Sequence, residues 1–180
     1  YGLTPGLDCY SDDISVSEQG TSFTLHCKGH EPLRLTTRLL GRHNVLNITG
    51  AAALALHLGV SPAGITAALR RLKPVPHRLE LKNNGGVIVI DDAYNSNPEG
   101  AAEALRVLGS LQGRRRILIT PGMVELGENE YAANRELGRV AAPYCDDVIA
   151  VGRVRDALFE GLDSEGFPEQ RRHAVKNLRE

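Results

Sequence analysis

The sequence predicts an α/β protein whose C-terminal part is a Rossmann-like, doubly wound parallel sheet. Three observations support this fold class. The short, continuously apolar run Val87–Ile90 is typical of a strand buried on both faces. Beyond it, apolar strand segments alternate with helical segments, and crossovers of this length join parallel strands in a right-handed sense. Before it, two prolines in Lys73–His77 interrupt the pattern and predict a stiff linker between two domains, 1–76 and 77–180.

In the first domain, residues 1–20 show no sustained period. From Ser22 to Lys28 apolar and polar residues alternate, which predicts a half-buried strand. An antiparallel partner around Leu33–Thr36 would follow a turn at Gly29–Pro32. A metal site at His26 and His30 is disfavoured, because no third ligand lies nearby in the sequence. We therefore assign no metal ligand.

Two helices follow this hairpin. The hairpin and the two helices together make up the first domain. The first helix is predicted over Val45–Gly59, which is dense in Ala and Leu. The second begins after Ser61, a good N-cap, with Pro62 in its first turn, and it runs to about Leu72.

In the second domain, a turn at Asn83–Gly86 joins strand Leu79–Leu81 to strand Val87–Ile90 as a hairpin. Asn97 as N-cap and Pro98 in the first turn predict the start of the next helix. The remaining predicted elements are helix Pro98–Leu111, strand Ile117–Thr120, helix Glu128–Ala142, strand Val148–Val151 and helix Val154–Gly161.

The composition is that of an ordinary globular protein, with 42% apolar residues, 24% charged residues and a net charge of −1. We therefore expect no nucleic-acid partner and, since no apolar run reaches the length of a membrane span, no membrane partner. Cys9, Cys27 and Cys145 form no CxxC pair, which favours reduced thiols over a disulfide or zinc framework. The chain begins at Tyr1 without an initiator Met, and we interpret it as a piece of a longer protein.

The stretch Val87–Pro98, VIVIDDAYNSNP, organises the chain. Asp91 and Asp92 follow a strand, at the end where open α/β sheets place their ligands. On the pattern alone, two acids that cap a turn are as good an interpretation as two acids that bind a ligand. Along an extended strand the two side chains point to opposite faces.

DDAYNSNP resembles the DD-x-YN-x-NP motif of the ATP-dependent Mur ligases. Two further stretches, GRHNVLNITGAAA at 41–53 and GMVELGE at 122–128, resemble the same family in the expected order and spacing. The resemblance implies that residues 1–76 are the C-terminal part of the central ATP-binding domain and that 77–180 are a truncated C-terminal domain. The closest resemblance is to the ligase branch that adds D-alanyl-D-alanine to a UDP-linked muramoyl tripeptide through an acyl phosphate.

The resemblance also implies which residues bind ATP. Asn44 and Asn47, three residues apart, would contact the adenine, with His43 beside them. Arg78, directly after the linker, would contact the phosphates. Asp92 would accept hydrogen bonds from the ribose hydroxyls, while Asp91 is structural. Tyr94 and Asn95 follow in the same loop and could line the cleft.

Some family features differ or are absent. Gly122 stands where the dipeptide-adding branch has an acid, and Asn134 where many members have a histidine, so no catalytic role is assigned to this loop. The sequence has no G-x-x-G-K-[ST] phosphate loop and no K-G-S segment. We therefore expect no catalytic residue here, Mg²⁺ ligands mostly outside this chain, and an inactive fragment of a monomeric cytoplasmic enzyme.

Other interpretations stay open. Within the ligase class they are another muramyl ligase or a relative of cyanophycin or folylpolyglutamate synthetase. Outside it, a non-catalytic flavodoxin-like binding module would explain the alternation of strands and helices. Such a module has no use for GRHNVLN or for the linker KPVPHR.

Overall fold

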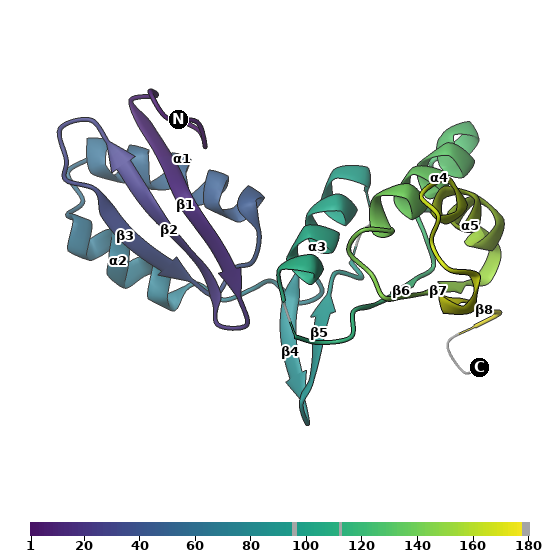
Figure 1. Ribbon diagram of the computed structural model, residues 1–180. Coiled ribbons are helices and arrows are strands. Elements are labelled where there is room, and N and C mark those ends of the chain that lie inside the picture. Colours follow the sequence, from purple (N-terminus) through teal and green to yellow (C-terminus); the bar gives the residue numbers. More distant parts are fainter. Residues whose placement is uncertain (95–96, 112, 178–180) are drawn as a thin grey trace. The chain divides into compact units, whose positions relative to one another are not determined.

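The computed structural model describes residues 1–94, 97–111 and 113–177 (Figure 1). The chain forms two compact units, Tyr1–Asp91 and Asp92–Glu180. This division falls after the hairpin, 15 residues beyond the boundary expected at 76/77, which stays a prediction. None of the described helices is long and apolar enough to cross a membrane.

The first unit contains a three-stranded antiparallel sheet in the order β1-β2-β3. The predicted strand and its partner are confirmed, with Phe23 opposite Leu35. The first strand was not predicted from the sequence, because its inward-facing positions include the polar residue Ser11. The three strands are β1 (Cys9–Ser17), β2 (Gly20–Cys27) and β3 (Leu33–Thr37).

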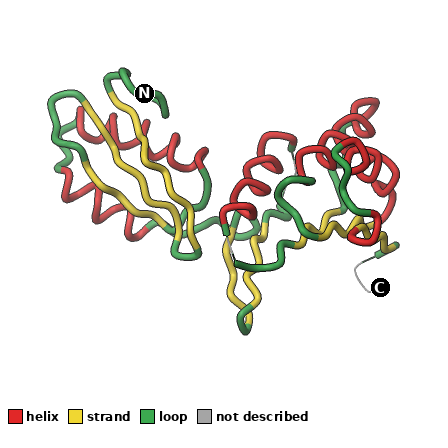
Figure 2. The backbone as a smooth tube through the Cα atoms, viewed as in Figure 1, coloured by secondary structure: helices red, strands yellow, loops and turns green. Residues whose placement is uncertain are grey.

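Two helices, α1 (Arg42–His57) and α2 (Pro62–Arg71), lie on the same face of this sheet (Figures 1 and 2). Both helices were predicted to within three residues. At the start of α2, the Ser61 hydroxyl accepts a hydrogen bond from the Gly64 N–H at 3.2 Å, as expected for an N-cap. The core between sheet and helices contains Phe23, Leu25, Leu35, Val45, Ile48, Ile65 and Leu69.

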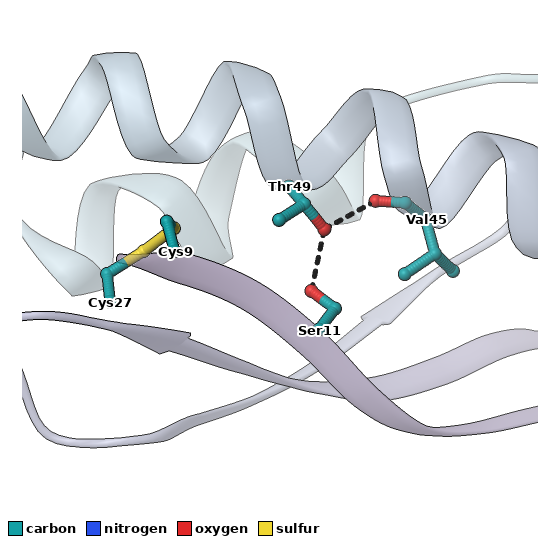
Figure 3. The surroundings of a disulfide bond; sticks show 5 residues. All are labelled: Cys9, Ser11, Cys27, Val45 and Thr49. Carbon is teal, nitrogen blue, oxygen red and sulfur yellow. Dashed lines mark hydrogen bonds between the residues drawn. A yellow bond between two sulfur atoms is a disulfide. The ribbon is translucent and has the colours of Figure 1, made fainter. Parts of the chain in front are cut away.

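The expectation of three reduced thiols is wrong for two of them. Cys9 and Cys27 form a disulfide (Figure 3), because the register of β1 on β2 places them directly opposite one another with their Cα atoms 4.1 Å apart. Cys145 is free and buried, and burial raises the pKa of its thiol to about 12.

A buried pair of hydroxyl groups joins the sheet to α1 (Figure 3). The Ser11 and Thr49 hydroxyls lie 2.7 Å apart, and Thr49 also donates to the Val45 carbonyl at 2.7 Å. Both side chains are fully buried. These bonds give β1 a polar contact with the core in place of an apolar one.

The hairpin of β4 (Glu80–Asn84) and β5 (Val87–Asp91) forms a two-stranded antiparallel sheet of its own. The predicted turn is confirmed, with Asn84 opposite Val87. The expectation that Val87–Ile90 is buried on both faces is wrong. Val87 is 63% exposed and Val89 39% exposed, because β5 pairs with its hairpin partner and alternates in exposure along its length.

The second unit contains the predicted parallel sheet, in the order β6-β7-β8. Leu137, Val148, Leu158 and Leu162 lie at the centre of its core, where α4 packs against α5 and α5 against β7. β6 has the predicted bounds, and β8 was not predicted. The elements are α3 (Pro98–Ser110), β6 (Ile117–Thr120), α4 (Glu130–Ala141), β7 (Asp147–Val151), α5 (Arg155–Ser164) and β8 (Arg172–Val175), with short 3₁₀ turns at Gly127–Asn129, Gly152–Val154 and Glu169–Arg171.

Candidate functional site

The start of α1 carries three of the predicted nucleotide-binding residues. Gly41 precedes the helix at φ 89°, a backbone conformation that glycine adopts without strain. The Asn44 amide donates to the Leu40 carbonyl at 2.8 Å and lies 3.0 Å from His43 Nε2. Asn47 is exposed and lies three residues further along the same face of the helix. The Leu40 contact therefore fixes the Asn44 side chain beside the exposed amide of Asn47.

Arg78 lies in a tightly defined turn at the start of the hairpin. Its neighbours His77 and Leu79 have φ angles of 60° and 47°, in the left-handed region that residues with a Cβ rarely adopt. The Arg78 N–H donates to the Val75 carbonyl at 3.1 Å, and Leu79 is buried. The turn and the buried leucine together fix the main chain at the exposed Arg78.

Asp91 belongs to an ion-pair network within the hairpin. Its carboxylate accepts from Lys82 Nζ at 2.6 Å and lies 2.8 Å from His77 Nδ1. Lys82 also lies 3.2 Å from Glu80. The hydrogen bond to Asp91 raises the pKa of Lys82, and the hydrogen bond from Lys82 lowers the pKa of Glu80. Asp91 is therefore held by β4 and the linker, as a structural residue would be.

Asp92 follows β5 and leads into the loop before α3. It is half-buried, and Tyr94, two residues on, is 66% exposed. The loop ends at Asn97, whose side chain accepts from the Gly100 N–H at 2.8 Å and caps α3 as predicted. Asn95, also named as a candidate, lies outside the described residues.

The structure brings some of these candidates together. His43, Asn44 and Asn47 share one face at the start of α1, and Arg78 lies in the turn before β4, in the same unit. Asp92 and Tyr94 open the second unit. Their proposed contacts with a nucleotide stay predictions.

The loop after β6 contains an ordered feature that the sequence analysis left without a role. The Asn134 side chain, only 1% exposed, accepts from the Met123 N–H at 2.7 Å and donates to the Met123 carbonyl at 2.9 Å. One signal could have revealed it. Asn134 is the polar member of an otherwise apolar helical face that contains Leu137 and Ala141 at spacings of three and four.

Two of the hollows in the described part of the chain are lined by residues other than the nucleotide candidates. One, of about 450 Å³, is lined by residues from β1 and β2 and the loops beside them, among them Tyr10, His26 and Lys28. The other, of about 370 Å³, lies where the loops after β6 and β7 meet α4, and its lining includes Glu130, Asn134 and Arg153. Among the residues described, no three His, Cys, Asp or Glu side chains group to hold a metal ion.

The family described as "Mur ligase, glutamate ligase domain" matches residues 77–180. The UDP-N-acetylmuramoyl-tripeptide–D-alanyl-D-alanine ligase of Bacillus subtilis is 35% identical over 164 residues, which are 89% of this chain and 35% of that protein. The enzyme of the same name from Escherichia coli is 35% identical over 155 residues, 84% of this chain and 33% of that protein. The chain thus spans about a third of the length of these relatives.

The chain is also similar to solved structures of Mur ligases. MurF from Acinetobacter baumannii has a TM-score of 0.76 and 29% identity, covering 95% of this chain and 36% of that one. MurF from Thermotoga maritima, solved in complex with ADP, has a TM-score of 0.72 and covers 94% of this chain and 37% of that one. At 22% identity the second likeness shows the fold alone.

Proposed function

Because the chain belongs to the Mur ligase family, we propose that it is part of an ATP-dependent ligase of the MurF type. That enzyme would join D-alanyl-D-alanine to a UDP-N-acetylmuramoyl tripeptide in peptidoglycan synthesis. ATP would phosphorylate the carboxylate of the tripeptide, and the amine of the dipeptide would attack the resulting acyl phosphate and release phosphate. The names of the relatives from B. subtilis and E. coli support this branch over other muramyl ligases.

Within this enzyme the chain would supply contacts with the adenosine part of ATP. Asn44 and Asn47 would offer amide donors and acceptors to the adenine edge, with His43 orienting Asn44. Arg78 would contact the phosphates. Tyr94 and Asn95, which follow the DD motif in the sequence, would also contact the nucleotide.

Asp92 would accept hydrogen bonds from the ribose hydroxyls, and one observation carries this assignment. The neighbouring Asp91 is already bound by Lys82 and His77 within the hairpin, and successive residues of an extended chain point in opposite directions. These contacts support a structural role for Asp91, and Asp92, which points the other way, would carry the ligand role that the family motif implies.

Magnesium would accompany ATP and neutralise charge on the phosphoryl group in transfer. The described residues offer no cluster of ligands for it, so its ligands would come from elsewhere in the enzyme, and no step is assigned to it here. We place the enzyme in the cytoplasm, where ATP and UDP-linked precursors are found, and expect a monomer.

A chimeric ligase tests the proposal. The chain would replace the matching C-terminal third of the B. subtilis relative, and product would be detected by mass spectrometry with ATP, the tripeptide precursor and D-alanyl-D-alanine. We expect the dipeptide adduct and an equal amount of phosphate. A product formed only when a single amino acid replaces the dipeptide in a parallel reaction would favour another muramyl ligase. A soluble, folded chimera that makes no product would contradict the proposal.

A further inference from the structure

The side chain of Asn134 forms a two-point clamp on the backbone of Met123. Its oxygen accepts from the Met123 N–H at 2.7 Å, and its nitrogen donates to the Met123 carbonyl at 2.9 Å and to the Glu130 carbonyl at 2.8 Å. A buried amide that fulfils both its donor and its acceptor roles in this way holds the loop as a paired strand would. The loop after β6 thus depends on a side chain from α4.

Gly122 makes this clamp possible. Its φ of +76° is one that side-chain-bearing residues rarely adopt, and its N–H donates to the Thr120 hydroxyl at 2.9 Å. A Cβ at this position would lie 2.3 Å from Asn134 Oδ1 and 2.6 Å from a methyl group of Val154. Gly122 and Asn134 are therefore a matched pair, because a side chain at 122 and the present pose of Asn134 exclude one another.

The clamped loop has an exposed tip. Met123 is buried, whereas Val124 is 49% exposed. Glu125 is also exposed and has a φ of 64°, a strained conformation for a residue with a Cβ. Such a conformation persists only where the surrounding structure imposes it, and the clamp two residues earlier supplies that constraint.

The loop and its clamp border the hollow of about 370 Å³. Gly127 of the loop and Asn134 both line it, beside the ion pair of Arg153 with Glu130 at 2.8 Å. The hollow lies at the carboxyl ends of parallel strands, the end at which open α/β sheets bind ligands. A guanidinium and carboxylates together suit a small zwitterion, which carries one ammonium and one carboxylate group.

We propose that Asn134 is a positioning residue of the ligase, which acts through Met123 to hold the loop Pro121–Gly127 in the shape that receives the incoming dipeptide. This inference rests on the proposed function. Asn134 touches the backbone of the loop rather than the reacting atoms. Removal of the Asn134 side chain should therefore lower kcat/KM for the dipeptide and leave the KM for ATP nearly unchanged.

Amide hydrogen exchange on the 180-residue chain tests the clamp itself. The Met123 amide should exchange at least tenfold faster in Asn134→Ala than in the wild type. In Asn134→Asp, which keeps the acceptor oxygen but turns a second oxygen towards the Met123 and Glu130 carbonyls, the Met123 amide should also exchange faster than in the wild type. Asn129→Ala is the matched control, because Asn129 lies just before α4 and its side chain makes no capping hydrogen bond. A Met123 amide that exchanges equally fast in the wild type and in Asn134→Ala would overturn the clamp.

Steady-state kinetics of the chimeric ligase tests the positioning role. For Asn134→Ala we expect kcat/KM for D-alanyl-D-alanine to fall roughly tenfold and the KM for ATP to stay within about twofold of the wild type. Asn134→Asp should show a similar loss, because it removes both hydrogen bonds that the Asn134 nitrogen donates. Gly122→Ala should also lower kcat/KM for the dipeptide, because its Cβ would collide with Asn134 and with Val154 and its φ is positive.

The outcomes separate the two claims. If the wild-type chimera makes no product, the proposed function fails. If the wild type is active and Asn134→Ala matches it in kcat/KM for the dipeptide, this inference fails while the proposed function stands. If the KM for ATP and the KM for the dipeptide both rise by similar factors, this inference also fails, since a general structural role predicts that result.

Discussion

Gly161 of α5 packs so closely on α4 that a Cβ at this position would lie 1.9 Å from the main-chain carbonyl oxygen of Arg135. The contact is reciprocal. A Cβ on Gly138 of α4 would lie 2.1 Å from the Leu158 carbonyl oxygen of α5. The two glycines thus let the backbones of α4 and α5 come into contact. This contact holds α4, which carries Asn134, against α5.

Gly161→Ala should therefore destabilise the second unit. The clash is with backbone, which cannot rotate away as a side chain could, so a loss of about 1–3 kcal/mol or more in the free energy of unfolding is expected. Denaturant unfolding followed by circular dichroism would measure it. Gly64→Ala in α2 is the control, because its nearest neighbour is a side-chain methyl group at 3.2 Å and alanine favours a helix. A Gly161→Ala protein as stable as the Gly64→Ala protein would contradict the close helix contact.

Two adjacent ion pairs join the starts of β6 and β7, and they predict a dependence of stability on pH. Side-chain and backbone hydrogen bonds from Arg116 lower the pKa of Asp146 to about 2, from an ordinary value of 3.8. A hydrogen bond from Arg115 lowers the pKa of the neighbouring Asp147. A folded-state pKa below the unfolded one gives stability that is present above pH 3.8 and is lost as the pH falls towards 2.

We therefore expect the Tm of the chain to fall between pH 4 and pH 2, and Asp146→Asn to flatten that fall while lowering the Tm at pH 7. Calorimetry across this range would measure both effects. Asp8→Asn serves as the control, since the Asp8 side chain is 90% exposed and lies 4.0 Å from Lys28. An acid transition unchanged in Asp146→Asn would show that other carboxylates control it.

The boundary between the proposed domains can be tested by proteolysis. The prolines of Lys73–His77 interrupt the helical pattern, and the turn Asn83–Gly86 is exposed, so a protease should cut at these places before it cuts the helices. Mass spectrometry of the first fragments would locate the sites. First cuts spread through α3 and α4 would count against a boundary in this region.

The two adjacent acids should differ in the chimeric ligase. Asp92→Ala should raise the KM for ATP roughly ten- to hundredfold, because a charge-assisted hydrogen bond contributes about 1.5–3 kcal/mol, and it should change the KM for D-alanyl-D-alanine less. Asp91→Ala should instead lower stability, because Lys82 and His77 lose their common partner. Steady-state kinetics and thermal unfolding of both variants would decide. Swapped effects would mean that the assignment of the two faces is wrong.

Local signals in the sequence predicted much of the fold. Ser61 and Asn97 cap the helices they were expected to cap, and β6 has its expected bounds, because caps and short apolar runs act through neighbouring residues. Strand β1 was missed because its buried Ser11 is balanced by Thr49, 38 residues away, and hydrophobic periodicity cannot show such a partner.

Features that depend on register or on exposure could not be predicted in the same way. The Cys9–Cys27 bond follows from the pairing of β1 with β2, and the exposure of Val87 follows from the pairing of β5 with β4. For the candidate site, the family motifs gave residue types and order. They did not show that Asn134 would bind the Met123 backbone, because that contact depends on how α4 lies against the loop.

Titration of the 180-residue chain with ATP, followed by nuclear magnetic resonance and by phosphate release, tests the central claim most directly. A few hydrogen-bonding groups, each contributing about 1 kcal/mol, predict an affinity no better than about millimolar. We expect shift changes confined to His43–Asn47, Arg78 and Asp92–Tyr94, and no phosphate release with both peptide substrates present. Shift changes at the hollow beside His26 instead, micromolar affinity, or measurable turnover would contradict the account.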